Sequence, residues 1–339
     1  MKKVLRVVVG SGLILSLLTF DVLAKQAQQA TQQSMPHQYT PAQWLEKMVR
    51  AANTVSYKGR SIFHDGSRMM SLKIVHGMID GEPWDRVVHL SGEPAEVLRQ
   101  GKKISCLHPE NAVELVVSDS SNSNDDLSLV NTFRGVDFVV PERYQLRMGG
   151  ESRVAGRDVQ IINVIPIDRA RYGYHLGLDK ETGLLLKTAT LNKQQKVLEV
   201  FEFVDVSIGG PLTESDFMPG SGVQWVSVPI KSVPQVGSRV GVDWKAQWLP
   251  EGFHLAENEV RNIDGVNVNA QVYSDGLAAF TIFMEKVESK GDVEGSKQKG
   301  ATIALSRRVT WESGNYMVTV VGEVPMEIAM QVAASVTKN

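Results

Sequence analysis

Histidine and cysteine are the residues of this chain with which metal or nucleophilic chemistry could begin. The seven histidines are scattered, and no two of them lie two or four residues apart, the spacings that bring two ligands together on a strand or a helix. The spacing of the histidines does not exclude a metal site whose ligands come from distant strands. The one cysteine, Cys106, excludes an internal disulfide, a CxxC redox pair and a multi-cysteine zinc site. Its strand-like surroundings favour a structural role.

The sequence motifs of catalysis are missing as well. The chain has no HExxH, no GxSxG, no P-loop and no GxGxxG after a strand. The carboxylate pair Asp125-Asp126 lies in a polar stretch and is typical of a solvated loop. We therefore expect no enzyme activity, no metal site and no cofactor.

Some apolar side chains point to binding instead. Methionine lines adaptable apolar surfaces and recurs in the first half of the chain, although an ordinary core is the alternative for each residue. The residues that we expect to contact a lipid are Trp44, Met48, Met69, Leu72 and Leu129. Tyr172 and Tyr174 alternate on a strand-like run, so their rings face the same side, either as interface anchors or as cross-strand pairs.

Composition places the chain among ordinary globular proteins. Its 339 residues suggest about two domains, with 42% apolar and 22% charged residues. There are 36 Lys and Arg against 38 Asp and Glu, a formal net charge of −2. This balance gives no electrostatic reason to expect a nucleic-acid partner.

The first residues have the layout of a secretory signal peptide. A basic start is followed by an apolar run over residues 7–20, and Val22 and Ala24 stand three and one positions before Lys25. We expect cleavage after residue 24, with an uncleaved anchor as the alternative. The run is short for a membrane span.

Cleavage at this point predicts a bacterial periplasmic protein. Removing residues 1–24 takes away three basic residues and one acidic residue, so the formal net charge becomes −4. No cysteine follows directly, which disfavours a lipid-anchored lipoprotein. Residues 25–38 are rich in Gln, Ala and Ser and are typical of a flexible N-terminus.

Residues 39–207 predict a domain dominated by antiparallel strands. A capping box at Thr40, with Pro41 at the first helical position, precedes a helix with one apolar face. Alternation of apolar and polar residues then predicts about eleven short strands joined by tight turns. The predicted strands are 57–63, 69–76, 84–91, 94–100, 103–107, 112–117, 144–148, 158–167, 171–178, 184–192 and 196–206. An open sheet of this size must curl. The fold class that we expect is α+β and mainly antiparallel β, with a half-open barrel wrapped around helices.

One polar segment interrupts the predicted strands. Residues 118–126 form a loop rich in Ser, Asn and Asp, and residues 125–134 predict a short apolar helix. The two together are either a lid over the concave side of the sheet or an ordinary surface connection.

A linker and a second domain follow. Residues 208–241 contain four of the 13 prolines and predict an extended linker along a surface. Residues 242–337 predict a small antiparallel sheet with one covering helix that starts at Pro325. Val336 is expected on the inner face of that helix, and residues 288–300 are expected to form a loop.

The order and spacing of several segments resemble the RseB/MucB family, the periplasmic negative regulators of extracytoplasmic sigma factors. The most specific segments are RYGYHLGLDKETGLLLK (171–187) and the hairpin YSDGL (273–277). The resemblance also rests on residues 45–66, 71–82, 90–99, 104–109, 154–170, 248–253, 278–283 and 320–336. It covers nearly all of the chain beyond the signal segment.

The resemblance implies a fold and a function. The first domain would be similar to the lipoprotein carriers, and the second would be the family's sheet-plus-helix domain. The protein would bind the periplasmic domain of a RseA/MucA-like anti-sigma factor and shield it from proteolysis. Lipopolysaccharide or another lipid would release it, and the sigma factor would then be freed. A difference of about 2.7 kcal/mol between two states suffices for a hundredfold change in affinity.

Two other functions compete with this one. A lipid or lipoprotein carrier would use the first domain alone, and the second domain argues against it. A periplasmic hydrolase would need a clustered nucleophile and base, and the scattered histidines argue against that. For the protein partner, we expect contacts from Trp225, Tyr273, Ser274, Asp275, Gly276 and Leu277, although Asp275-Gly276 is also favourable turn chemistry. Self-association into a homo-oligomer is left open.

Overall fold

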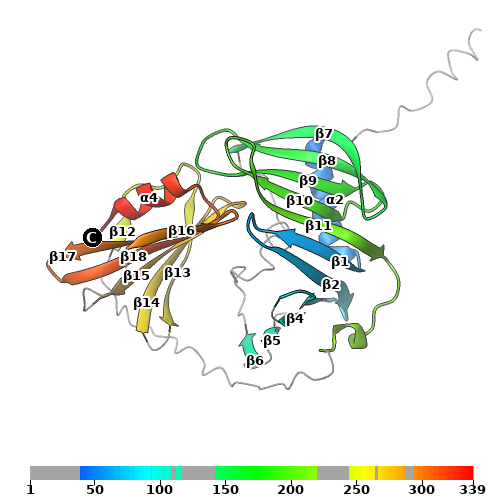
Figure 1. The fold of residues 1–339 in the computed structure, drawn as a ribbon, viewed down its shortest axis with the longest axis horizontal. Coiled ribbons are helices and arrows are strands. Elements are labelled where there is room, and N and C mark those ends of the chain that lie inside the picture. Colours follow the sequence, from blue (N-terminus) through cyan, green and yellow to red (C-terminus); the bar gives the residue numbers. More distant parts are fainter. Residues whose placement is uncertain are drawn as a thin grey trace, which may run out of the picture. The chain divides into compact units, whose positions relative to one another are not determined.

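Two antiparallel sheets make up most of the described chain (Figure 1). The computed structural model describes residues 39–92, 94–101, 103–107, 112–116, 142–219, 244–263, 266–287 and 294–338. The predicted signal segment, the polar loop 118–126 and the short helix 125–134 lie outside these residues. Within them, no helix is long and apolar enough to cross a membrane.

Helix α2 (Pro41–Thr54) packs its apolar face against the first sheet. Trp44, Leu45, Met48 and Ala51 are buried at helical spacing, as the sequence predicts. Lys47, on the same helix, donates from Nζ to the carbonyl oxygen of Lys180 at 2.7 Å. This bond ties the helix to the turn between two strands of the sheet.

The first sheet has eleven strands that follow one another in space almost as they do in sequence. Its order is β6-β5-β4-β3-β2-β1-β11-β10-β9-β8-β7, and each pair of neighbouring strands is antiparallel. The strands are β1 (Tyr57–His64), β2 (Met69–Ile79), β3 (Glu82–His89), β4 (Glu96–Gln100), β5 (Lys103–Leu107), β6 (Ala112–Val116), β7 (Tyr144–Val154), β8 (Arg157–Pro166), β9 (Gly173–Asp179), β10 (Leu185–Leu191) and β11 (Val197–Ile208).

The pairing of β1 with β11 joins the first six strands to the last five. Because β6 and β7 stand at the two ends of the order, the sheet is not closed into a barrel. The predicted fold class is confirmed: antiparallel sheets dominate, and the first one stays open. Side chains of β9 show the alternation, with Tyr174, Leu176 and Leu178 buried on the face toward α2.

Strand β7, at one end of the strand order in the described part of the sheet, carries a bulge. The register shifts between Met148 and Glu151, and the two glycines between them face the side chain of Gln160. Its Nε2 donates to the carbonyl oxygens of Gly149 at 2.9 Å and Gly150 at 3.2 Å. Such a bulge bends an exposed edge strand and disfavours pairing with another chain.

The start of the predicted linker packs on the first sheet. The 3-10 helix η1 (Glu214–Phe217) follows β11, and Phe217 is buried against the ring of Trp84, with centroids 5.7 Å apart. Residues 220–243 lie outside the described chain. The domain boundaries at 207/208 and 241/242 stay predictions.

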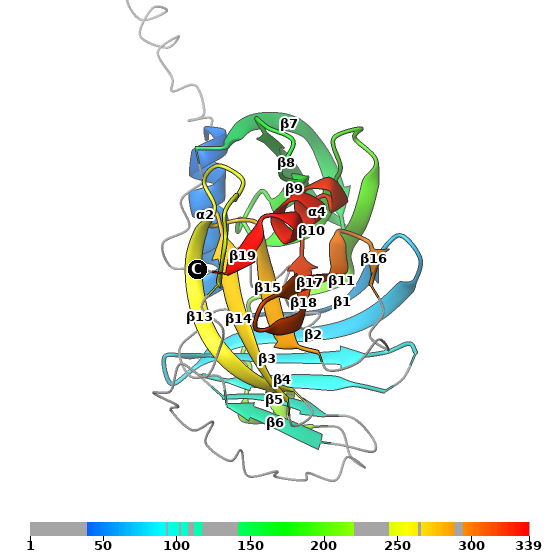
Figure 2. The same ribbon diagram turned by 90° about the vertical axis from the view of Figure 1, so that its left-hand side faces the viewer.

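The second sheet has the order β13-β14-β15-β18-β17-β16, and α4 (Met326–Ala334) contacts β17 and β18 (Figure 2). Its strands are β13 (His254–Ile263), β14 (Val266–Ser274), β15 (Ala279–Lys286), β16 (Gly295–Lys299), β17 (Thr302–Trp311) and β18 (Gly314–Gly322). The core beneath α4 contains Phe280, Ile282, Val318, Val320 and Val332. The predicted antiparallel sheet with one covering helix is confirmed.

Two local predictions in this sheet are wrong. Residues 295–299 form β16 instead of a loop, because their backbone pairs with β17 although their side chains are exposed and polar. Val336 is buried but does not belong to the helix. Ser335 ends α4, and residues 336–338 form β19, which pairs with β12 (Trp244–Ala246).

Candidate functional site

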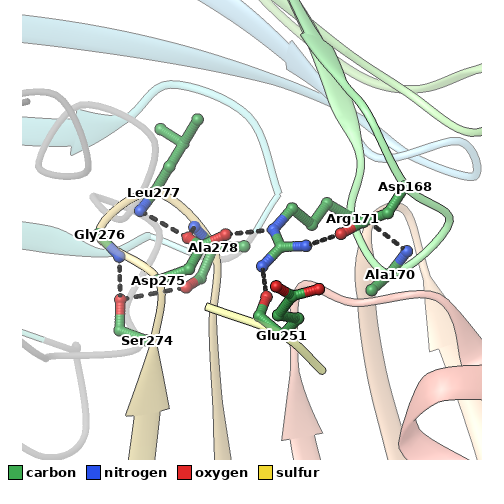
Figure 3. A network of polar contacts seen from close by, with 9 residues as sticks. All are labelled: Asp168, Ala170, Arg171, Glu251, Ser274, Asp275, Gly276, Leu277 and Ala278. Carbon is green, nitrogen blue, oxygen red and sulfur yellow. Dashed lines mark hydrogen bonds and ion pairs between the residues drawn. The ribbon is translucent and has the colours of Figure 1, made fainter. Parts of the chain in front are cut away.

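The hairpin Tyr273–Leu277, expected to bind a partner, is held by the chain's own Arg171 (Figure 3). Arg171 lies in the segment between β8 and β9, and its side chain is fully buried. Its Nε lies 2.5 Å from Oδ2 of Asp275, its Nη1 pairs with Asp168, and its Nη2 donates to the carbonyl oxygen of Glu251 at 2.5 Å. Three acceptors therefore surround one guanidinium group.

This environment keeps Arg171 charged. Burial lowers the pKa of Arg171, but the hydrogen bonds and charges of Asp275 and Asp168 outweigh burial and raise the pKa above its ordinary value. The cation also lies over the ring of Phe253, with its Cζ 4.9 Å from the ring centroid.

Asp275 serves the hairpin and Arg171 at the same time. Its Oδ1 accepts the backbone N–H groups of Leu277 at 2.9 Å and Ala278 at 2.7 Å, which fixes the turn. Its Oδ2 is left for Arg171. Gly276 has a φ of 95°, a conformation that other residues rarely adopt, so the turn needs glycine there. The Asp275-Gly276 pair noted in the sequence thus has two roles: it forms the turn, and it places a carboxylate oxygen of Asp275 against Arg171.

The two apolar side chains of the hairpin enter different cores. Leu277 is 5% exposed and packs with Trp44, Met48 and Tyr174 in the core beneath α2. Tyr273 stays in the core of the second sheet, where its ring stacks on Phe280 with centroids 5.5 Å apart. The hairpin is therefore anchored in its own sheet at one end and in the first sheet at the other.

Further polar contacts join the same two parts of the chain. Tyr172 donates from its hydroxyl to the carbonyl oxygen of Val324 at 3.1 Å. Lys193 pairs with Glu327 at 3.4 Å on the surface. Tyr172 is thus an interface anchor, whereas Tyr174 packs beneath α2. Apart from Leu277, the contacts named here are polar, as in interfaces between domains that can rearrange.

The residues expected to contact a lipid do not share one surface. Trp44 and Met48 are buried under α2 beside β9, and Leu72 is buried in a second cluster with Tyr57. Met69 is 65% exposed and, three residues before Leu72 on β2, faces the other side of the sheet. Their contact with lipid stays a prediction.

Two expected contact residues cannot be placed. Leu129 and Trp225 lie outside the described residues. Ser274, by contrast, is placed, and its Oγ accepts the backbone N–H of Gly276 at 3.0 Å and so supports the turn.

Sequence reasoning missed a basic groove on the first sheet. A cavity of about 410 Å³ lies beside β1, β2, β3, β11 and η1. Its charged lining residues are Lys58, Arg60, Lys73, Arg86, Asp205 and Asp216. Arg86 is paired with Glu96, but neither Arg60 nor Lys73 forms an ion pair within the described part of the chain. Arg60 lies directly opposite Lys73 on β2 and, on its other side, opposite Asp205 on β11. The two cations repel each other, and Asp205 and Asp216 in the groove offset part of that repulsion.

The groove could have been found from the hairpin register. Asp65-Gly66 marks the turn between β1 and β2, and pairing the strands from that turn places Arg60 opposite Lys73. A lone basic residue on a strand carries no such signal. Among the described residues no group of three or more His, Cys, Asp or Glu side chains is arranged to hold a metal ion.

Comparison with protein families decides what kind of protein this is. The model of the MucB/RseB N-terminal domain matches residues 40–221, and that of the MucB/RseB C-terminal domain matches residues 238–337. The chain belongs to the MucB/RseB family. The resemblance predicted from the sequence is confirmed.

Curated relatives of this MucB/RseB family chain are named as regulators. It is 32% identical over 296 residues to the sigma factor AlgU regulatory protein MucB of Pseudomonas aeruginosa, covering 86% of this chain and 89% of the relative. It is 25% identical over 298 residues to the sigma-E factor regulatory protein RseB of Escherichia coli K12, with coverages of 86% and 89%. The family consists of regulatory binding proteins, so the prediction that the chain is not an enzyme is confirmed.

Solved MucB structures share the fold of this MucB/RseB family chain. A structure of MucB in complex with MucA(peri) is 30% identical, covers 88% of this chain and 99% of its own, and superimposes with a TM-score of 0.70. A structure of MucB is 29% identical, covers 87% and 97%, and superimposes with a TM-score of 0.59.

Proposed function

We propose that the protein is a periplasmic binding protein that represses an envelope-stress sigma factor. It binds the periplasmic domain of a RseA/MucA-like anti-sigma factor and shields that domain from regulated proteolysis. The anti-sigma factor then keeps the sigma factor inactive. The observation that carries this proposal is the 30% identity and TM-score of 0.70 to MucB solved with MucA(peri), over 88% of this chain.

The architecture supports binding without catalysis. Two sheets that meet through Arg171, Tyr172 and Leu277 offer an arrangement that a ligand could favour or disfavour. The hairpin residues Asp275 and Leu277 are engaged within the chain. Partner contacts there would use the outer side of the hairpin or would compete with Arg171.

We infer that release is triggered by lipopolysaccharide through its phosphate groups and its acyl chains. The basic groove supports the first part, because Arg60 and Lys73 are cations without ion-pair partners among the described residues. The net charge alone argues against a large basic patch, so the groove acts as a local site. Acyl chains would need apolar surface beside it, and exposed Met69 lies on β2.

Titration calorimetry with the periplasmic domain of the anti-sigma factor from the same genome tests the first step. A cleavage assay with the protease that first cuts this anti-sigma factor tests protection. We expect saturable binding and slower cleavage in the presence of the protein. Absence of binding, or an unchanged rate of cleavage under saturating conditions, would refute the proposal.

Lipopolysaccharide is then added to the preformed complex. Intact lipopolysaccharide should restore cleavage, and a preparation stripped of its phosphates should restore it less. A pull-down from periplasm separates the carrier alternative, since recovery of lipoproteins in place of an anti-sigma factor would favour a lipid or lipoprotein carrier.

A further inference from the structure

A buried carboxylate of the first sheet holds a turn of the second sheet. Glu199, on β11, is 5% exposed, and its Oε1 accepts the backbone N–H of Ala301 at 2.8 Å. Gly300 approaches so closely that a Cβ built on it would fall 2.2 Å from the same oxygen. Lys299 pairs with Asp65 at 2.9 Å beside it. We call these five residues the Glu199 contact.

The charges in the Glu199 contact do not balance. Asp65 is 3% exposed and also accepts hydrogen bonds from Ser67 and the backbone of Arg68, so it is well held as an anion. Glu199 forms no ion pair with any described residue: Lys299, whose charge favours ionised Glu199 from a distance, forms its ion pair with Asp65. The charge of Glu323, after β18, repels that of Glu199 as well.

We propose that the Glu199 contact is pH-dependent, so that the Lys299–Ala301 turn is held firmly on β11 in mildly acid solution and is loosened above neutral pH. Protonation of Glu199 removes a buried charge that faces two other carboxylates, and the neutral carboxyl still accepts the Ala301 N–H. Ionised Glu199 is instead stabilised by water, which reaches it when the turn leaves. This property goes beyond binding of an anti-sigma factor and does not depend on it.

The direction of the pH effect follows from the pKa of Glu199 when the turn is docked and when it is undocked. In the docked state burial raises the pKa of Glu199 to about 7. The hydrogen bond from the Ala301 N–H lowers this pKa, but burial has the larger effect. A carboxyl open to water titrates near 4.3. A raised pKa in the docked state means that docking is favoured below pH 7 and loses that advantage as the pH rises through 7. Between pH 8 and pH 6 the docking constant should rise by about tenfold.

Asp65 and two tyrosines near Glu199 keep their charge state over this interval. Burial raises the pKa of Asp65, but the hydrogen bonds from Lys299, Arg68 and Ser67 outweigh it and hold that pKa far below its usual range. Burial raises the pKa values of Tyr172 and Tyr174 above the ordinary tyrosine value, so both stay neutral. His64, the last residue of β1, directly precedes Asp65 and is replaced in a control variant.

Amide hydrogen exchange at Ala301 tests the proposal in the purified chain. The protection factor, corrected for the intrinsic effect of pH on exchange, should rise about tenfold from pH 8 to pH 6. The amide of Val287, which donates to the carbonyl oxygen of Asn315 at 3.0 Å within the second sheet, serves as the internal reference. Equal protection of Ala301 at both pH values would overturn the proposal.

Three variants assign the effect. Glu199→Gln keeps an acceptor without a charge, so protection of Ala301 should be flat with pH. His64→Gln should leave the pH dependence intact. Gly300→Ala, which places a Cβ against Glu199, should lower protection of Ala301 at both pH values while that of Val287 is kept. A pH dependence that survives in Glu199→Gln, or one that disappears in His64→Gln, would contradict the assignment to Glu199.

Discussion

Arg171 and Asp275 are 104 positions apart in the sequence, and their side chains meet at 2.5 Å with almost no exposure to solvent. One residue precedes β9 of the first sheet, and the other lies in the turn between β14 and β15 of the second. Each residue also forms other hydrogen bonds. Arg171 donates to the carbonyl oxygen of Glu251, and Asp275 accepts the backbone N–H of Leu277 and so fixes its turn. The pair is therefore a point at which the folding of both sheets and their contact depend on each other.

Replacing Arg171 should destabilise the chain strongly. Arg171→Met leaves the carboxylate of Asp275 buried without a counter-ion, and breaking such a pair costs about 4 kcal/mol. Urea unfolding followed by circular dichroism measures the loss. Arg169→Met is the matched control, because Arg169 is exposed two residues away and should change stability by less than about 0.5 kcal/mol. Equal midpoints for the two variants would show that the ion pair contributes nothing.

Leu277 should act through packing. Leu277→Ala removes a buried side chain from the core beneath α2 and should cost about 3 kcal/mol. Leu255→Ala, at a leucine that is 51% exposed on β13, should cost far less. Both variants can then be titrated with the anti-sigma domain under conditions in which they are folded. Unchanged affinity for Leu277→Ala would remove this residue from the predicted partner site.

The strands of the first sheet were predictable because each carries its own signal. Alternation of apolar and polar residues located ten of the eleven strands within about three residues, and the turns between neighbours set the antiparallel order. The strand predicted at 144–148 was too short, because β7 continues past the bulge at its two glycines to Val154. Pairing of β1 with β11 and the contact of Arg171 with Asp275 have no such local signature. In the sequence, a buried arginine whose partner is far away along the chain cannot be distinguished from an arginine exposed to solvent.

β16 shows the same limit at the level of one element. Its residues 295–299 are polar and exposed, so no period of two marks them, and only backbone pairing with β17 makes them a strand. The basic groove is partly predictable. The sequence alone does not show that Arg60 and Lys73 are neighbours, but the register of the β1–β2 hairpin does. Lys299 at the end of β16, which pairs with Asp65, was likewise invisible in the sequence.

Anion binding should depend on Arg60 and Lys73, the two groove cations that form no ion pair with a described residue. Arg60→Gln and Lys73→Gln should each weaken binding of lipopolysaccharide about fivefold, equivalent to roughly 1 kcal/mol for an exposed charge contact. The double variant should also show a shallower dependence of affinity on salt. Fluorescence titration at two ionic strengths measures both effects.

The control for the groove is Lys245→Gln, because Lys245 is exposed on β12 and carries the same charge. It should bind lipopolysaccharide as the unmodified chain does. If all three variants weaken binding equally, the attraction comes from overall charge and the groove is not the site.

Asp179 should make the stability of the first sheet depend on acid. Its side chain is 1% exposed and accepts two bonds from Arg157, at 2.7 and 3.1 Å, and one from the backbone N–H of Thr182 at 2.8 Å. Burial raises the pKa of Asp179, but these bonds outweigh burial and lower the pKa below its ordinary value. A lowered pKa in the folded state stabilises the fold above about pH 4, and this stabilisation is lost as the pH falls through the folded-state pKa.

Asp179→Asn therefore tests whether the difference in the free energy of unfolding between this variant and the unmodified chain changes with pH. At pH 7 the variant should be less stable than the unmodified chain by about 2 kcal/mol, because charge-assisted bonds are replaced by weaker ones. Towards pH 3 the gap should narrow, since the unmodified chain loses the contribution of ionised Asp179. Asp158→Asn, at an exposed carboxylate on β8, should follow the unmodified chain at each pH. Urea midpoints at pH 3, 5 and 7 measure the gap, and a gap that stays constant over this range would show that Asp179 does not titrate with folding.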